Sequence, residues 1–162
     1  MDQILVEINS CLFESNGLFI TNYNTESEGK AYGACRFEIN GLKIISRNAK
    51  MTPKKMGQFV TVWKRSPQGI TQPFDENDVF DLLVINIKKS QQLGQFVFPK
   101  SVLIEKGIIT TSKKEGKRGF RIYPPWEIPT SKQALNSQNW QSDFFWQADD
   151  SKKDMKRLFN RI

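Results

Sequence analysis

The sequence predicts a single α/β domain of the α+β type, in which helices flank a mixed central β-sheet. Asn-Gly at 40–41 lies between two apolar, β-branched runs, the strongest short-range signal of a β-hairpin. The nearly continuous apolar run at residues 79–89 is typical of a central strand covered on both faces. Amphipathic patterns near both ends of the chain predict helices that cover the sheet.

The chain has 162 residues, a length that favours one compact domain. We assign residues 1–146 to this domain and residues 147–162 to a charged C-terminal tail or loosely docked helix. No apolar run approaches the ~18 residues that a membrane-spanning helix needs. The acidic N-terminus lacks the basic start of a signal peptide. We therefore expect a cytoplasmic protein that has no membrane partner.

The first half of the chain is predicted to contain one helix followed by strands. Residues 2–14 carry apolar side chains at helical spacing, Asp2 favours the helix N-terminus, and Asn16-Gly17 ends it. A polar loop is expected at residues 66–78. The predicted strands of this half are residues 32–39, 42–50, 57–65 and 79–89.

The second half is predicted to alternate strands and helices. A strand at residues 94–100 leads into a short helix that Ser101 caps and Gly107 closes. A flexible basic loop at 113–119 then precedes a strand that Pro-Pro ends. The remaining predicted elements are that strand at 120–126 and a last helix at 131–145 with Ala134, Leu135, Trp140 and Phe144 available for packing.

The chain contains no histidine and only two cysteines, Cys11 and Cys35. The lack of histidine excludes Ser-His-Asp and Cys-His catalysis and zinc sites with histidine ligands. We interpret both cysteines as reduced, buried thiols. Acid–base chemistry would have to use carboxylates, lysine or tyrosine, with or without a hard metal ion such as Mg²⁺.

Charge is unevenly distributed along the chain, whose formal net charge is +7. Residues 1–28 hold acids and no bases, whereas residues 43–65 hold seven bases and no acid. A second basic run covers residues 100–121. Such separation creates a surface potential that attracts polyanions. The alternative interpretation is a solvated basic surface that only aids solubility.

Three long motifs, TPKKMGQFVTVWKR, GQFVFPKSVLIEKGI and GKRGFRIYPPW, are followed by Gln138-Asn139-Trp140-Gln141. Together they resemble the MepB-like family over roughly residues 26–145. The resemblance implies a restriction-endonuclease-like α/β core. A nucleic-acid role then follows only by analogy of fold, which does not establish function.

Nucleases with that core carry an acid on one strand and an acid-x-Lys triplet on the next, where the carboxylates hold Mg²⁺. Asn48-Ala49-Lys50 has this spacing, but an amide replaces the acid. If the site were catalytic, Lys50 would act with Glu38 or Glu28, and Mg²⁺ would be held by Glu28, Glu38 and Asn48. The other interpretations are a degenerate phosphate site or ordinary solvent-facing strand positions.

Phosphate contacts in proteins come from Lys, Arg and Ser/Thr side chains. Trp63 could also stack on a base, although packing against the sheet is the preferred interpretation. The predicted nucleic-acid-binding residues are Arg47, Lys50, Lys54, Lys55, Lys64, Arg65, Lys100, Lys117, Arg118 and Arg121.

The first functional hypothesis is therefore a DNA- or RNA-binding protein that holds the phosphate backbone on a basic surface, without efficient catalysis and without a cofactor. The alternative is a Mg²⁺-dependent nuclease with a degenerate site. A third hypothesis is an adaptor for an acidic protein partner. Neither GxGxxG nor a P-loop occurs in the sequence, so a nucleotide cofactor is not expected.

Overall fold

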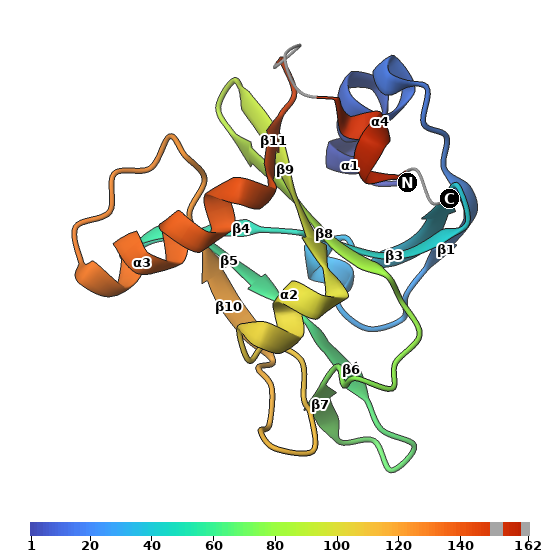
Figure 1. The fold of residues 1–162 in the computed structure, drawn as a ribbon, viewed down its shortest axis with the longest axis vertical. Helices are drawn as coiled ribbons and strands as arrows, with labels where there is room; N and C mark the ends of the chain where they lie inside the picture. Colours follow the sequence, from blue (N-terminus) through green and yellow to red (C-terminus); the bar gives the residue numbers. More distant parts are fainter. Residues whose placement is uncertain (150–153, 160–162) are drawn as a thin grey trace.

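The structure of the protein is a computed structural model that describes residues 1–149 and 154–159. It is a mixed α+β domain built on one central sheet (Figure 1). The sheet has the strand order β1-β2-β3-β8-β9-β11. Its β3–β8 pair is parallel and its other pairs are antiparallel, which confirms the predicted mixed sheet. The bounds are β1 Thr21–Thr25, β2 Cys35–Ile39, β3 Leu42–Asn48, β8 Leu82–Lys89, β9 Gln92–Pro99 and β11 Phe145–Gln147.

The predicted hairpin and the predicted central strand are both present. Strands β2 and β3 pair around Asn40 and Gly41, whose φ angles are +52° and +80°. Positive φ at both central residues is the geometry of a type I′ turn, which Asn-Gly favours. Strand β8 lies between β3 and β9, and its first six residues are buried.

A second, smaller sheet has the order β10-β5-β4. Its strands are β4 Lys50–Thr52, β5 Lys55–Thr61 and β10 Gly119–Ile122, and a separate ribbon pairs β6 Trp63–Arg65 with β7 Thr71–Pro73. The single strand predicted at 57–65 is therefore divided between β5 and β6. The break occurs at Val62, whose side chain is buried and whose N–H donates to the carbonyl oxygen of Arg118. Strand β7 occupies part of the predicted loop at 66–78.

The N-terminal helix begins as predicted. Helix α1 covers Gln3–Ile8 and continues through a π-helical turn and a 3₁₀ turn to Asn16. The carboxylate of Asp2 accepts hydrogen bonds from the N–H groups of Ile4 and Leu5, the usual role of an N-cap. Gly17, at φ +71°, ends the helix.

The two later helices differ from the prediction at their ends. Helix α2, Lys100–Glu105, begins after Pro99 and contains Ser101, so Ser101 is not its cap. Helix α3 covers Lys132–Gln141 and is capped by Ser131, whose Oγ accepts from the Ala134 N–H. The predicted helix at 131–145 ends there, because the chain turns after α3 and then forms β11.

Two hydrophobic clusters lie on opposite faces of the central sheet, because successive side chains of β8 alternate between them. Leu83, Ile85 and Ile87 belong to the cluster that faces α2 and the small sheet. Leu82 and Val84 belong to the cluster that faces α1. Figure 1 shows α1 and α4 on one side of β8 and β9, with α3 and the small sheet on the other.

The C-terminal segment packs more tightly than the prediction of a loosely docked tail. Helix α4, Met155–Leu158, and the residue after it place Met155 and Phe159 in the core, where both are fully buried. The rings of Phe13 and Phe159 meet edge to face at 5.9 Å. Residues 150–153 and 160–162 of the predicted tail lie outside the described residues.

The two cysteines have different environments. Cys35 is buried as predicted, whereas Cys11 is exposed, so the prediction is wrong for Cys11. Burial raises the pKa of the Cys35 thiol to about 11. Among the described residues, no helix is long and apolar enough to cross a bilayer.

Candidate nucleic-acid interface

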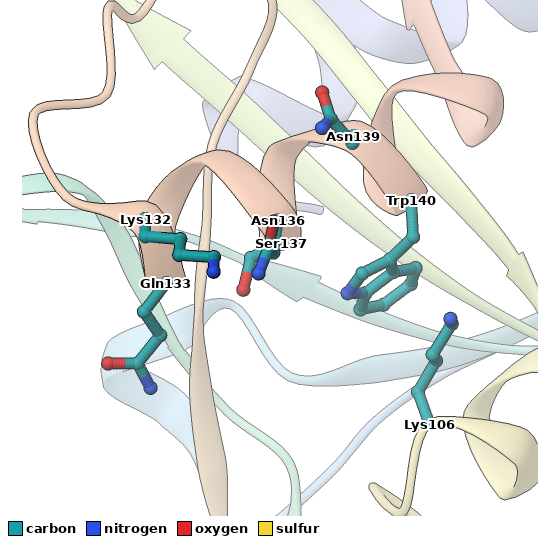
Figure 2. A pocket seen from close by; sticks show the side chains of 7 residues that line it. All are labelled: Lys106, Lys132, Gln133, Asn136, Ser137, Asn139 and Trp140. Carbon is teal, nitrogen blue, oxygen red and sulfur yellow. The ribbon is translucent and has the colours of Figure 1, made fainter.

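A hollow on the described surface lies between helix α3 and the small sheet. One part of it has a volume of about 580 Å³ and runs from the turn before β5 across β10 to α3. A second part of about 600 Å³ lies along α3 (Figure 2). The two parts share Lys106, Gln133, Ser137 and Trp140 as lining residues, so they adjoin. We refer to them together as the α3 groove.

Six cationic side chains line the α3 groove, and none of the described lining residues is Asp or Glu. Five of the six are exposed, while the arginine is half-buried. A concave surface lined by one sign of charge concentrates its field and raises the local concentration of counter-ions. The six residues are Lys54, Lys55, Lys106, Lys117, Arg121 and Lys132.

Arg121 is held rigidly at the floor of the groove by strand β10. Its guanidinium donates to the Thr52 hydroxyl at 2.6 Å and to the Met56 carbonyl oxygen at 3.1 Å. These acceptors are neutral, so they orient the guanidinium without cancelling its charge. Arg121 therefore adds a fixed positive charge beside the exposed lysines.

Helix α3 is fastened to the rest of the molecule by side-chain amides. Gln141 is 1% exposed. Its Oε1 accepts from the Tyr123 N–H at 2.8 Å, and its Nε2 donates to the Arg121 carbonyl oxygen at 3.1 Å. One turn earlier, the Gln138 amide donates to the carbonyl oxygens of Pro124 and Glu127. The amides thus position one wall of the groove against β10 and the segment that follows it.

The basic segment at 113–119 was predicted to be flexible, but backbone contacts hold it in place. The Gly116 N–H donates to the Thr110 hydroxyl, and the Lys117 N–H donates to the Ile108 carbonyl oxygen. A Cβ on Gly116 would lie 2.3 Å from that Ile108 oxygen, so only glycine fits there. This packing fixes Lys117 at the edge of the groove.

The structure brings together four of the ten predicted nucleic-acid-binding residues. These are Lys54, Lys55, Lys117 and Arg121. The other six lie elsewhere, and most of them already have a partner.

Arg47 is a clear correction, because its side chain is 1% exposed and lies 2.9 Å from a carboxylate oxygen of Glu26. A buried, paired guanidinium cannot reach a phosphate from solution. Its role is structural, in the interior of β3.

Two further predicted cations belong to ion pairs near the β6–β7 ribbon. Lys64 lies between Asp75 and Asp78, at 2.9 and 2.8 Å, and its hydrogen bond lowers the pKa of Asp75. Arg65 pairs with Glu28 at 2.7 Å and lowers the pKa of that carboxyl group. The hydrogen bonds commit these side chains to local acids.

The remaining three predicted cations also lie outside the lining of the groove. Arg118 contacts Glu115 and donates to the Thr71 carbonyl oxygen at 3.0 Å. Lys100 donates to the Asp78 carbonyl oxygen. Lys50 is exposed, with its ammonium 4.9 Å from the ring centroid of Tyr32.

The residues of the predicted nuclease triplet do not meet the predicted acids. Asn48 is buried, and its amide donates to Asp2 at 2.8 Å and accepts from Asn86 at 3.0 Å. Glu38 pairs in register with Lys43 at the other end of β3, about 16 Å from Asn48 at the usual rise per residue. Glu28, the other predicted acid, is paired with Arg65 as described above.

Within residues 1–149 and 154–159, no group of three or more Cys, Asp or Glu side chains is placed to hold a metal ion. Of the predicted set, Glu38 lies at the far end of β3 from Asn48 and Glu28 is paired with Arg65. The nitrogen and the oxygen of the Asn48 amide are both hydrogen-bonded to other side chains of the protein.

Two groove cations, Lys106 and Lys132, are not among the predicted binding residues, and Trp140 is predicted only to pack. Lys132 follows the Ser131 cap, a position where a side chain projects from the first turn of a helix. Lys106 stands at the end of α2. Single residues such as these carry little signal, because only the tertiary packing of α2 and α3 brings them together.

Comparison with known proteins agrees with the resemblance noted from the sequence. A MepB-like family model matches residues 26–147. A solved structure described as the crystal structure of MepB superposes with a TM-score of 0.81, is 32% identical, and covers 93% of this chain and 100% of its own. No curated protein sequence shows significant similarity to the chain.

A second solved structure, of a bacterial homing endonuclease, is 15% identical and covers 85% of this chain and 84% of its own. Its TM-score of 0.46 is too low to support an argument about function. The match to the family model and the similarity to the MepB structure are much stronger than this. They show that the chain belongs to the MepB-like family.

Proposed function

We propose that the protein binds nucleic acid by its phosphate backbone in the α3 groove and does not cleave it efficiently. The observation that carries the proposal is the set of six cations in a concave surface whose described lining contains no acid. Several cations that lie elsewhere, such as Lys64 and Arg65, are paired with carboxylates. The groove gathers six cations in one concave surface whose described lining offers them no carboxylate.

A polyanion suits this groove better than a small anion, because the cations are distributed along it. They come from the turn before β5 and its first residue, from β10 and the segment before it, from the end of α2 and from the start of α3. Each phosphate that a lysine neutralises releases bound counter-ions, which favours an extended partner with many phosphates. Backbone contacts of this kind position a nucleic acid without reading its sequence.

The predicted triplet, Asn48-Ala49-Lys50, favours binding without efficient cleavage because it lacks the acid that would hold a metal ion. Asn48 supplies no charge and belongs to a buried hydrogen-bond network with Asp2 and Asn86. Lys50 lies outside the groove lining. A Mg²⁺-dependent nuclease would need acids from other positions, so it is kept as an alternative outcome of the test.

The test is a fluorescence-anisotropy titration of the full chain with labelled DNA and RNA, each single-stranded and double-stranded. It is run at two salt concentrations, with and without Mg²⁺, and each endpoint is examined on a denaturing gel. Saturable binding that weakens with salt and leaves the oligonucleotide intact supports the proposal. Shortened oligonucleotide that depends on Mg²⁺ would establish the nuclease alternative.

Charge-reversal variants locate the binding site. We expect Lys54→Glu/Lys55→Glu to weaken binding strongly, because both lysines are exposed and line the groove. Lys30→Glu is the control, because Lys30 is equally exposed but lines neither part of the groove. No binding of the wild type to any nucleic acid at low salt would overturn the proposal and would direct the search to an acidic protein partner.

A further inference from the structure

We infer that Trp140, with the amide side chains beside it on α3, forms a subsite for one unpaired nucleobase next to the phosphate-binding part of the groove. The inference rests on the proposed function and adds to it a contact with a base. Trp140 lines both parts of the groove, so a base placed against it would belong to the same chain whose phosphates meet the lysines.

The indole of Trp140 is half-buried and firmly supported. Its ring centroid lies 5.4 Å from that of Phe98, and the two planes are inclined by 46°. Figure 2 shows the amino group of Lys106 directed at the indole, and its Nζ lies 5.5 Å from a ring centroid. A supported aromatic ring beside cations is the arrangement on which bases stack in proteins that bind unpaired strands.

Side chains that can hydrogen-bond to a base lie near the Trp140 ring. Gln133 and Asn136 project from α3 into the part of the groove that Figure 2 shows, and Ser137 lies between them and Trp140. Amide side chains offer both donors and acceptors, as the edges of bases do. A binding site for phosphate alone would not require acceptors, since phosphates accept hydrogen bonds.

Lys106 has two roles in this arrangement. Without nucleic acid it makes a cation–π contact with Trp140. A stacking base would replace that contact and leave Lys106 to neutralise a neighbouring phosphate. Lys132, at the start of α3, provides a second cation beside the amides.

Trp63, the aromatic residue considered from the sequence, is in a less suitable place. Arg65 lies over its ring at 5.5 Å and is paired with Glu28. Glu26 and Glu28 line the hollow beside it. A base stacked there would bring its phosphates close to carboxylates, whereas the described lining around Trp140 has none.

The inference is tested with two fluorescein-labelled oligodeoxynucleotides of equal length, one carrying thymine throughout and one abasic throughout. We expect the wild type to bind the thymine strand about 5- to 150-fold more tightly, the range for one stacked base. Trp140→Leu should bind the two strands with equal affinity, because the affinity for the thymine strand falls and the affinity for the abasic strand stays unchanged. Trp63→Leu is the matched control and should preserve the ratio.

Thermal melting by circular dichroism shows whether each variant is folded. If Trp140→Leu fails to fold, Trp140→Phe keeps an aromatic face against Phe98 and should preserve most of the ratio. Gln133→Ala/Asn136→Ala, on exposed positions, should reduce the ratio without changing the melting temperature.

Each outcome distinguishes the inference from the proposed function. Equal affinity of the wild type for the thymine and abasic strands would overturn the base subsite while leaving the phosphate-binding proposal intact. If a folded Trp140→Leu variant still prefers the thymine strand over the abasic strand, the base subsite does not lie at Trp140. No binding of either strand would overturn the inference, and the proposed function would be overturned as well only if the duplex and RNA titrations described above also showed no binding.

Discussion

Gln141 is the residue whose replacement most directly tests how the groove is built. Its buried amide holds two backbone groups, the Tyr123 N–H and the Arg121 carbonyl oxygen. In Gln141→Ala both groups lose their partner at partly buried positions beside the groove. A buried polar group left without a hydrogen bond costs about 1–3 kcal/mol and a group that water can reach costs less, so we expect the free energy of unfolding to fall by about 1–3 kcal/mol. That is a large part of the stability of a typical domain, about 5–15 kcal/mol.

The assay is urea unfolding at 25 °C, followed by circular dichroism and extrapolated to water. Gln141→Glu should be at least as destabilised as Gln141→Ala at neutral pH, because an ionised glutamate would bury a charge and place an acceptor oxygen against the Arg121 carbonyl oxygen. Gln133→Ala, the same substitution at an exposed position of the same helix, should stay within about 0.5 kcal/mol of the wild type. A Gln141→Ala variant as stable as Gln133→Ala would refute the assigned role of the amide.

Three further predictions concern other parts of the fold. Arg47→Met should lower the free energy of unfolding by about 1–3 kcal/mol in urea titrations, because the partly buried Glu26 then keeps only its longer ion pair with Arg36. In native protein at neutral pH, a thiol reagent should modify Cys11 only, since Cys35 is buried and has a raised pKa, and unfolding should expose the second thiol to the reagent. Gly116→Ala should weaken nucleic-acid binding and destabilise the fold by about 1–3 kcal/mol, because the new methyl group meets the backbone.

Each of the three has a contradicting result. Unchanged stability of Arg47→Met would mean that its ion pair contributes nothing net. Modification of two thiols in native protein would mean that the interior around Cys35 opens readily. Full stability and full affinity of Gly116→Ala would show that the segment around it can shift without affecting the groove.

The parts of the fold that the sequence predicts well are those set by local chemistry. Asn40-Gly41 can adopt positive φ, so the hairpin follows from two residues. The apolar run of β8 predicts a central strand because a strand buried on both faces needs apolar side chains throughout. The start of α1 likewise follows from Asp2 as its cap.

The parts that the sequence misses depend on distant contacts. Strand β11 exists because Gly94 on β9 leaves room for the ring of Phe145, and a Cβ on Gly94 would lie 2.3 Å from that ring. The break at Val62 similarly depends on a distant contact, because the Val62 N–H donates to the carbonyl oxygen of Arg118, the residue before β10. Local patterns do not contain this information.

Only part of the candidate site can be predicted, because the sequence shows which cations are neighbours in the chain but not which side chains meet in the fold. Basic runs identify Lys54, Lys55 and Lys117 because several cations near one another in sequence imply an accessible positive surface. The same reasoning assigns Arg47 wrongly, since its partner Glu26 comes from an acidic stretch of the chain far from the run. Charge that looks unpaired along the sequence can be paired in the fold.

The measurement that tests the central claim most directly is the salt dependence of nucleic-acid affinity, compared between the wild type and Lys54→Ala/Lys55→Ala. If each of the six groove cations neutralises one phosphate, log K should fall with log salt with a slope of about −4 for a single strand or about −5 for a duplex. The double variant should give about −3 or −4, respectively, because two contacts are lost. A slope that is the same in both proteins would contradict the account, because the two lysines would then touch no phosphate.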